Sequence, residues 1–304
     1  RLILATGSKP FIPPIAGADL KGVISFRDIY DINTMLDYCK TKKNAVVIGG
    51  GLLGLEAAYG LKQRGMNVTV LHLMDRIMER QLDGRASRML RQSIEEKGIN
   101  IITEANTEAL IGKDGHVNQV RLKDGIVLDA DLVVFAVGIR PNITLAQSAG
   151  LRCNRGILVN DTMQTFDPSI YAVGECIEHR NQTFGLVEPL WGQAFICATH
   201  LAEHGSLTFK SPTVPTQLKV SGVDVFSAGN IDPADDYEDI ILNDEKRQIY
   251  KRIIIQKDKV IGAVLFGDTE DGMWYAELIA DQTPISTFRN KLLFGKDFAM
   301  KKAG

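Results

Sequence analysis

The chain has 304 residues, of which 45% are hydrophobic and 24% are charged, so it is long enough for about two globular domains. Its 35 lysines and arginines nearly balance its 37 acids, giving a net charge of −2, which disfavours binding to nucleic acid or to an anionic membrane surface. The longest apolar stretch, residues 45–55, contains four glycines and is too short to span a bilayer, which indicates a soluble protein.

The first residues predict a strand. Residues 2–5 are apolar, and no turn or cap precedes them. Because a predicted buried strand starts here without a preceding turn or cap, we expect the chain to begin inside a domain. No signal peptide is visible, and this absence is weak evidence because the first residue is Arg1 and not Met.

Residues 44–143 predict a nucleotide-binding domain. A continuous apolar run at 45–48, a glycine loop, a helix ending near Arg64 and a strand at 68–71 together form a βαβ unit. Further along the chain we expect a helix at 84–97, strands at 99–102 and 132–135, and a hairpin turn at 123–125.

The flanking segments, 1–43 and 144–206, predict two pieces of one discontinuous domain, because each contains a short apolar strand that ends in a glycine turn. From residue 207 to 304 the pattern changes to alternating strands at 249–255 and 260–266, followed by a helix at 271–280. We expect a smaller α+β domain there. The predicted fold class is therefore α/β, with this α+β domain at the C-terminal end.

The glycine loop has the spacing of a dinucleotide-binding motif, Gly49-x-Gly51-x-x-Gly54, with a strand before it and a helix after it. The first glycine permits a tight turn, the second lets a pyrophosphate approach the backbone, and the third allows the helix to pack closely on the strand. The helix N-terminus, which includes Leu52 and Leu53, offers unpaired N–H groups to the phosphates. A glycine turn without a ligand is the disfavoured alternative, because all three glycines and both flanking elements fit.

The sequence does not identify which residue would distinguish NADH from NADPH. About 20 residues after the loop, where NAD-binding domains usually have an acid for the ribose hydroxyls, this chain has His72, followed by Asp75 and Arg76. A neutral histidine can bind a hydroxyl, whereas a protonated histidine or Arg76 could bind a 2′-phosphate. The sequence therefore does not decide between NADH and NADPH, and of the two we favour NADH.

The cysteines indicate neither disulfides nor a metal site. Cys39, Cys153, Cys176 and Cys197 form no CxxC pair, so we expect a reducing, cytoplasmic location and no dithiol redox centre in this chain. A zinc site would have to combine the cysteines at 176 and 197 with His179, His200 and His204, but these groups lack the spacing of a zinc finger. We expect no metal.

Four separate segments resemble the FAD- and NAD(P)-dependent pyridine nucleotide-disulphide oxidoreductases. They are residues 5–10, the glycine loop at 49–56, the stretch at 135–142 and the stretch at 165–175. Five stretches resemble the flavoprotein part of the large subunit of NAD(P)H nitrite reductases: residues 71–74, 78–83, 219–229, 267–269 and 293–296. Compared with that family, the chain lacks the first FAD-binding βαβ unit and the cysteine motifs of the iron–sulfur and sirohaem modules.

The resemblance implies FAD and NAD(P)H as cofactors and two Rossmann-like domains. Residues 44–143 would bind NAD(P), and residues 1–43 with 144–206 would form an incomplete FAD-binding domain. The implied NAD(P) residues are Gly49, Gly51, Leu52, Leu53, Gly54, Glu56, His72, Arg76 and Gly138. The implied FAD residues are Ala5, Thr6, Gly7, Gly174, Glu175, Leu190 and Trp191.

Some of these roles have simpler alternatives. Glu56 would point toward the nicotinamide, but it is equally expected as a solvated or ion-paired helix residue. Glu175 stands where the family usually has an aspartate, and the extra methylene could shift the contact with FAD. Trp191 is expected first as an ordinary core aromatic and second as a neighbour of the flavin ring.

The implied function is transfer of hydride from NAD(P)H to FAD and of electrons onward to a redox partner. In an intact nitrite reductase, nitrite would be reduced to ammonia at a separate sirohaem centre. A rubredoxin or ferredoxin reductase would share the same motifs. An alternative of another class is a non-catalytic nucleotide-binding or interaction module, because half of the FAD site is absent. The C-terminal domain could form a homodimer interface, as it often does in the family.

Overall fold

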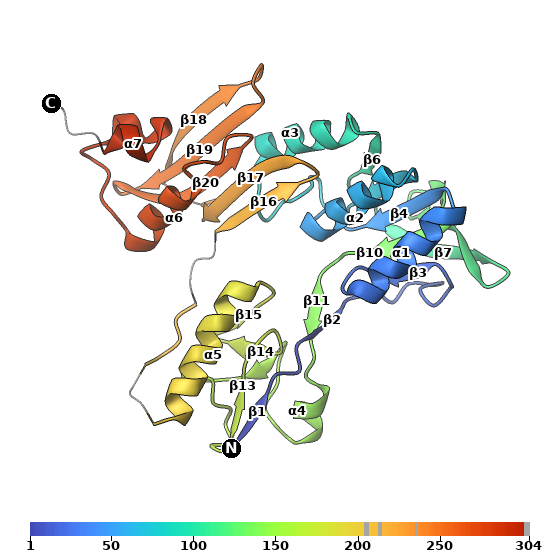
Figure 1. Ribbon diagram of the computed structural model, residues 1–304, viewed down its shortest axis with the longest axis horizontal. Coiled ribbons are helices and arrows are strands. Elements are labelled where there is room, and N and C mark those ends of the chain that lie inside the picture. Colours follow the sequence, from blue (N-terminus) through green and yellow to red (C-terminus); the bar gives the residue numbers. More distant parts are fainter. Residues whose placement is uncertain (204–206, 212–214, 235, 301–304) are drawn as a thin grey trace. The chain divides into compact units, whose positions relative to one another are not determined.

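The computed structural model describes residues 1–203, 207–211, 215–234 and 236–300. The chain divides into two compact units. One unit contains residues 1–11 and 138–214, and the other contains residues 12–137 and 215–304. Figure 1 shows the elements of both units along the chain, from blue at the N-terminus to red at the C-terminus.

The larger unit contains a five-stranded parallel sheet in the order β3-β10-β4-β5-β6. Its strands are β3 (Val23–Ser25), β4 (Asn44–Ile48), β5 (Asn67–Leu71), β6 (Ile99–Ile102) and β10 (Leu132–Phe135). From β4 the chain proceeds outward to β5 and β6 and then returns to β10 on the other side of β4. The strand order therefore reverses between β4 and β10, and open α/β sheets bind ligands beyond the carboxyl ends of strands at such a point.

Both faces of this sheet are buried, which explains the continuous apolar runs in its strands. On one face, Ala45 and Val47 belong to a core with residues of three helices, α1 (Ile29–Thr41), α2 (Leu52–Gln63) and α3 (Gly84–Glu95). On the other face, Val46 and Ile48 pack against a second sheet of three antiparallel strands. These strands are β7 (Thr107–Lys113), β8 (His116–Leu122) and β9 (Val127–Asp129). The predicted hairpin turn joins β8 to β9.

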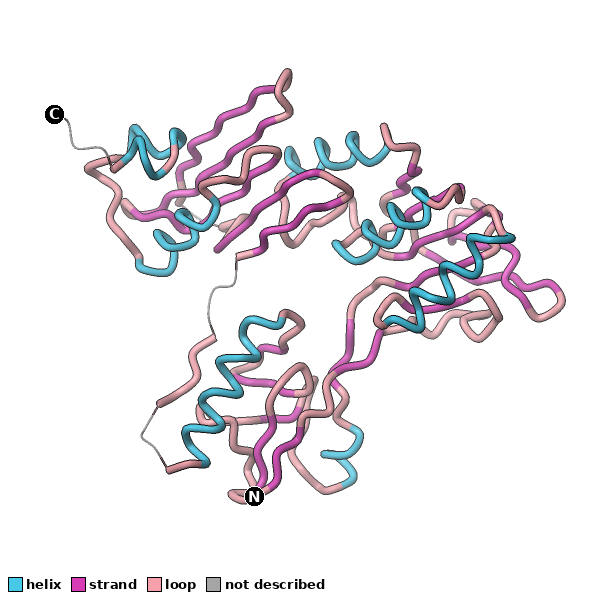
Figure 2. Tube along the Cα trace, in the orientation of Figure 1, coloured by secondary structure: helices cyan, strands magenta, loops and turns pink. Residues whose placement is uncertain are grey.

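The C-terminal part of this unit is a five-stranded antiparallel sheet in the order β16-β17-β20-β19-β18. Its strands are β16 (Thr216–Val220), β17 (Val223–Gly229), β18 (Glu238–Asp244), β19 (Ile249–Gln256) and β20 (Lys259–Phe266). One face packs against α6 (Gly272–Asp281) and η1 (Arg289–Phe294), and the short helix α7 (Lys296–Ala299) follows, as Figure 2 shows beside the long strands. From the other face, Tyr250, Val264 and Phe266 enter the same core as α3.

The smaller unit is built from short elements around its own core. Its strands are β1 (Leu2–Leu4), β2 (Ser8–Pro10), β11 (Ile139–Pro141), β12 (Ile157–Leu158), β13 (Ile170–Ala172), β14 (Ile177–His179) and β15 (Gln182–Thr183). Its helices are α4 (Thr144–Ser148) and α5 (Val187–Leu201). β1 pairs in parallel with β13, and β2 pairs in the antiparallel sense with β11. Leu4, Tyr171 and Cys197 are among the buried residues of this core.

The predicted α/β fold class with a smaller C-terminal α+β part is confirmed. Residues 12–43 differ from the expected grouping with the FAD-binding segments, because β3 pairs with β10 and α1 contributes Met35 to the core of the parallel sheet. Across the residues that the structure describes, no helix is both long enough and apolar enough to cross a membrane.

Candidate functional site

The glycine loop follows β4, at the point where the strand order of the parallel sheet reverses. Gly49 has a φ of 126°, and a Cβ atom there would overlap the carbonyl oxygen of Ala136, the residue after β10. A Cβ atom at Gly54 would overlap the carbonyl oxygen of Gly49. These two positions require glycine because the backbone segments of the protein themselves approach closely.

Gly51 is different, because nothing in the protein fills the space beside it. Its backbone is extended, with φ −83° and ψ −179°, and an added Cβ atom would meet no heavy atom within 4 Å. Gly51 is the N-cap of α2, and among the described residues no side chain accepts a hydrogen bond from the first N–H groups of this helix. Unpaired N–H groups at the positive end of a helix dipole bind phosphates. The loop therefore fits the pyrophosphate of a dinucleotide.

The two leucines after Gly51 form the first turn of α2. Leu52 is partly buried against the core, whereas Leu53 is exposed. Their backbone N–H groups, and not their side chains, are suited to a phosphate.

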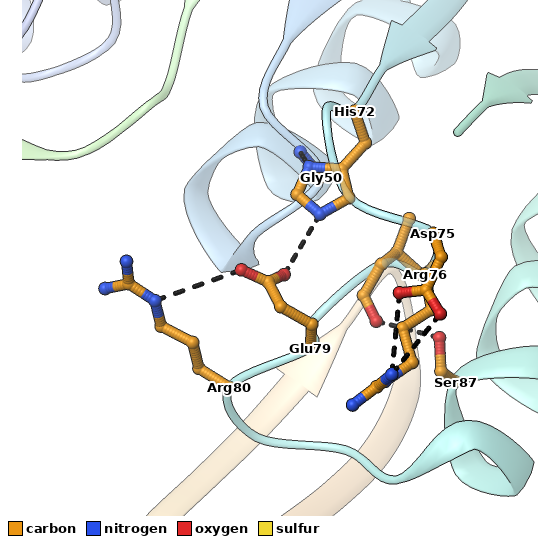
Figure 3. Close-up of polar contacts among 8 residues, drawn as sticks. Gly50, His72, Asp75, Arg76, Glu79, Arg80 and Ser87 are labelled. Carbon is orange, nitrogen blue, oxygen red and sulfur yellow. Dashed lines mark hydrogen bonds and ion pairs between the residues drawn. The ribbon is translucent and has the colours of Figure 1, made fainter. Parts of the chain in front are cut away.

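His72 follows β5 and is bound on both ring nitrogens by the protein (Figure 3). The backbone N–H of Gly50 donates to Nδ1 at 3.0 Å, so Nδ1 accepts and the proton of the neutral ring is on Nε2. Nε2 lies 3.0 Å from Oε2 of Glu79, to which it donates. The side chain of His72 is therefore attached to the glycine loop at one end and to a carboxylate at the other.

Arg76 has an acidic neighbour of its own. Its Nη1 lies 3.4 Å from Oδ2 of Asp75, and its Nε is buried without a hydrogen-bond partner within the described residues. Figure 3 shows the Asp75–Arg76 pair apart from the His72–Glu79 pair. A 2′-phosphate that reached Arg76 would thus also meet the charge of Asp75.

Glu56 lies on the exposed side of α2, five residues after Gly51. Nearby protein atoms partly desolvate its carboxyl group, and this partial burial raises the pKa of the carboxyl above its usual value. A carboxyl group with a raised pKa occurs both at functional sites and wherever a helix residue is partly covered.

The turns after β1 and β13 bring five of the seven predicted FAD residues together, namely Ala5, Thr6, Gly7, Gly174 and Glu175. The strands β1 and β13 lie side by side in Figure 1. Because they are parallel and Leu4 pairs with Ala172, residues 5–7 and 173–175 follow the carboxyl ends of the two strands at the same end of the sheet. Gly7 and Gly174 have φ values of 65° and 95°, and a Cβ atom on either would meet nothing within 4 Å. Open glycine turns at the carboxyl ends of parallel strands fit a dinucleotide such as FAD.

Side-chain hydrogen bonds connect the first of these turns to the second and to the residue that follows β11. The hydroxyl of Ser8 donates to Oε2 of Glu175 at 2.7 Å. Thr6 and Asn142 exchange two hydrogen bonds, from Thr6 Oγ1 to the Asn142 carbonyl at 2.6 Å and from Asn142 Nδ2 to the Thr6 carbonyl at 3.2 Å. Ala5 lies between Leu4 and Thr6 in the first of these turns.

Trp191 is 73% exposed, so its interpretation as an ordinary core aromatic is wrong. On α5, Val187 lies four residues before Trp191 and Phe195 lies four residues after it, so the three side chains share one helix face, and all three are exposed. Leu190 is instead partly buried against the core of this unit.

Gly138 lies between β10 and β11 with a φ of 101°. Its carbonyl accepts a hydrogen bond from the N–H of Phe11 at 2.9 Å, and a Cβ atom on it would meet nothing within 4 Å. The space beside Gly138 is therefore open, as the proposed approach of a nicotinamide requires.

Sequence reasoning missed two polar side chains that hold these turns. Gln193 is fully buried on α5, and its Oε1 accepts a hydrogen bond from the N–H of Gly174 at 2.8 Å. A glutamine inside an otherwise apolar helix was the available signal. Glu79 gave no comparable signal, because its contact with His72 depends on an irregular turn.

The candidate metal ligands have other partners. Nε2 of His179 lies 2.8 Å from Asp161 Oδ1, and Nδ1 of His200 lies 3.0 Å from the hydroxyl of Tyr171. Cys176 and Cys197 are buried, and His204 lies outside the described residues. No group of three or more His, Cys, Asp or Glu residues in the described part of the chain could hold a metal ion.

Comparison with known proteins extends these observations. Residues 1–194 match the family described as pyridine nucleotide-disulphide oxidoreductase, and residues 215–283 match the rubredoxin NAD+ reductase C-terminal domain. Over 94% of its length the chain is 51% identical to a nitrite reductase (NAD(P)H) of Bacillus subtilis (strain 168). Over 96% of its length it is 43% identical to the assimilatory nitrate reductase electron transfer subunit of the same organism. The chain covers only 35% and 38% of these two relatives.

A solved structure with a similar fold is a NAD-dependent persulfide reductase from A. fulgidus, with a TM-score of 0.86 and 28% identity, covering 95% of this chain and 58% of that one. Together these matches confirm the predicted family, the resemblance to the flavoprotein part of nitrite reductases, and FAD and NAD(P)H as the cofactors. The chain belongs to the pyridine nucleotide-disulphide oxidoreductase family.

Proposed function

We propose that this chain binds NAD(P)H at the glycine loop and contributes part of an FAD site, and that it passes electrons from NAD(P)H through FAD to a redox partner. The open space beside Gly51 at the N-terminus of α2 is the observation that carries this proposal. Hydride transfer between the two bound rings would be supplied by the cofactors themselves. The protein would position them.

In this proposal residues 44–143, together with residues 12–43 that pack beside them, form the nucleotide-binding domain. Residues 1–11 with 144–206 contribute to the FAD-binding domain, and residues 207–304 form an interface domain. Ala5, Thr6, Gly7, Gly174, Glu175, Leu190 and Trp191 would surround FAD, and Glu56 and Gly138 would face the nicotinamide. The exposed apolar side chain of Trp191 supports a role outside the core.

We assign the chain to a cytoplasmic nitrite reductase, in which electrons would continue through iron–sulfur and sirohaem modules and reduce nitrite to ammonia. The identity to the Bacillus subtilis nitrite reductase supports this substrate. Transfer to a small redox protein such as rubredoxin is a second candidate, favoured by the match of residues 215–283. Supplying each acceptor to the NADH-reduced intact protein distinguishes the two candidates.

The nucleotide site is tested by titrating the purified chain with NAD+ in a calorimeter, with no flavin needed. Gly51→Ala should weaken binding by about tenfold or more, because a methyl group would occupy the place of the phosphate. Gly51→Ala should still fold, since the added Cβ atom meets no protein atom within 4 Å. Gly60→Ala, on the same helix and also in open space, is the matched control and should bind normally.

Binding by the parent chain that Gly51→Ala leaves unchanged would contradict the placement of the pyrophosphate. Absence of any binding by the parent chain would contradict the proposed function of the loop. The visible spectrum of the chain with added FAD, before and after NADH under anaerobic conditions, then tests for hydride transfer. Loss of the flavin bands is the expected result for a complete site.

A further inference from the structure

We infer that Glu79 recognises the adenosine ribose of the bound nucleotide and favours NADH over NADPH, and that His72 is the positioning residue that attaches Glu79 to the glycine loop. This inference rests on the proposed function, because it concerns the same nucleotide site. It assigns ribose recognition to a residue that lies seven positions after His72, where the ribose-binding acid usually stands.

The first step concerns which group can meet the ribose. Dinucleotide-binding sheets usually place an acid after their second strand for the ribose hydroxyls, and this chain has His72 there. Both ring nitrogens of His72 already have partners, so the ring offers no acceptor to a hydroxyl. The polar group that contacts the outer nitrogen of this ring is the carboxylate of Glu79, whose Oε2 is 3.0 Å from Nε2 of His72 (Figure 3).

The second step concerns how firmly Glu79 is placed. Gly50 is bonded twice to this segment: its N–H donates to His72, and its carbonyl accepts from the N–H of Met78 at 3.0 Å. Met78 is fully buried and has a φ of 53°. A Cβ atom at Gly50 would lie 2.8 Å from Cγ of His72, so the approach leaves no room for a side chain. Glu79 is therefore held in fixed relation to the loop that binds the pyrophosphate.

The third step concerns charge. The side chain of Glu79 is 23% exposed, and its Oε1 is 3.9 Å from Nε of the highly exposed Arg80. A carboxylate oxygen accepts hydrogen bonds from ribose hydroxyls but repels a 2′-phosphate, which adds nearly two negative charges. Arg76, the residue best suited to a 2′-phosphate, lies against Asp75. The local charges therefore favour the nucleotide without the phosphate.

The central experiment measures the dissociation constants of NAD+ and NADP+ for the chain and for Glu79→Gln by calorimetry. The amide keeps the shape of the side chain but removes its charge. The ratio of the two constants should change by about tenfold or more toward NADP+, since a hydrogen bond to a charged group and a charge repulsion are both lost. Glu108→Gln is the control: it removes a carboxylate that is likewise paired with an arginine, 2.6 Å from Arg121 Nε, but lies away from the glycine loop, and it should leave the ratio unchanged.

Two substitutions of His72 separate its two contacts. His72→Asn retains an acceptor near the position of Nδ1 for the Gly50 N–H but loses the donor to Glu79, so the preference for NAD+ should fall while some affinity for both nucleotides remains. His72→Gln retains a donor near Nε2 but loses the acceptor for Gly50. The affinities for both nucleotides should then fall together, with the preference retained.

The inference is overturned if Glu79→Gln folds and either leaves both affinities unchanged or lowers them by the same factor. The latter result would make Glu79 only a support for the glycine loop. Should Glu79→Gln fail to fold, an unchanged nucleotide preference in His72→Asn would overturn it instead. If the parent chain binds neither nucleotide, the proposed function fails, and this outcome is distinct from a loss of preference.

Discussion

The hydroxyl of Tyr250 donates a hydrogen bond to Oδ2 of Asp83 at 2.7 Å, while Oδ1 of Asp83 accepts from the N–H groups of Arg85 and Ala86 and so caps α3. Tyr250 belongs to β19 of the C-terminal sheet, and α3 packs on the nucleotide-binding sheet. Burial and the neighbouring Asp83 raise the pKa of the Tyr250 phenol, so this donor keeps its proton at ordinary pH. The carboxylate of Asp83 thus caps α3 and links this helix to β19 of the C-terminal sheet.

Tyr250→Phe should lower the free energy of unfolding by about 1.5–3 kcal/mol, because it removes a part-buried hydrogen bond to a charged group. Urea unfolding at neutral pH measures the change. Tyr30→Phe, at a highly exposed position, is the control and should alter stability by no more than about 0.5 kcal/mol. Equal stabilities of the two variants would show that the Tyr250–Asp83 bond does not stabilise the fold.

Gly54→Ala should destabilise the fold by about 1–3 kcal/mol, because the new methyl group overlaps the Gly49 carbonyl and pushes α2 away from the sheet. Gly60→Ala, on the same helix, should instead stabilise it by about 0.5–1 kcal/mol, since alanine is the better helix former and its Cβ atom meets no other atom. Thermal unfolding of both variants measures the difference. A loss of stability in Gly60→Ala would contradict the open space at that position.

The βαβ unit around the glycine loop could be predicted because its signals are local. Three elements follow each other within about 30 residues: a strand buried on both faces, three spaced glycines and a helix. Each is marked by its own sequence pattern. The grouping of residues 12–43 could not be predicted in the same way. β3 has only three residues, and its pairing with β10 joins segments more than 100 residues apart.

The polar contacts of the candidate site could not be predicted from the sequence for a different reason. The contact between His72 and Glu79 depends on an irregular turn in which Met78 adopts a left-handed backbone conformation. Methionine seldom adopts this conformation, so composition gave no hint of it. The exposure of Trp191 could not be predicted either. Helical periodicity shows which residues share a helix face with Trp191, but it does not show whether that face contacts the rest of the protein.

Asp161→Asn should lower the melting temperature at pH 7 but have little effect near pH 2. Hydrogen bonds from Arg180 and His179 lower the pKa of Asp161 from 3.8 to about 2. Because the folded state holds this proton less tightly than the unfolded chain, the stabilisation is present above about pH 4 and is lost as the pH falls toward 2. Melting curves from pH 2 to 7 measure it, and a pH-independent difference between the variant and the parent chain would contradict this assignment.

Glu56→Gln tests whether the carboxylate on α2 contributes to reduction of FAD by NADH. Since partial burial raises the pKa of Glu56, the folded state holds this proton more tightly than the unfolded chain. The associated stability is therefore present at acid pH and is lost as the pH rises through the raised pKa, so Glu56→Gln should be at least as stable as the parent chain at pH 7.

If the charged carboxylate positions the nicotinamide, the rate of flavin reduction in the intact protein should fall on the acid side of the pH profile, and Glu56→Gln should remove that decline and lower the rate at pH 7. Anaerobic stopped-flow measurement of flavin bleaching at several pH values follows both effects. Glu95→Gln, on the exposed face of α3, should reproduce the parent profile. A Glu56→Gln profile that coincides with the parent profile would leave Glu56 as a helix residue whose pKa is raised by burial alone.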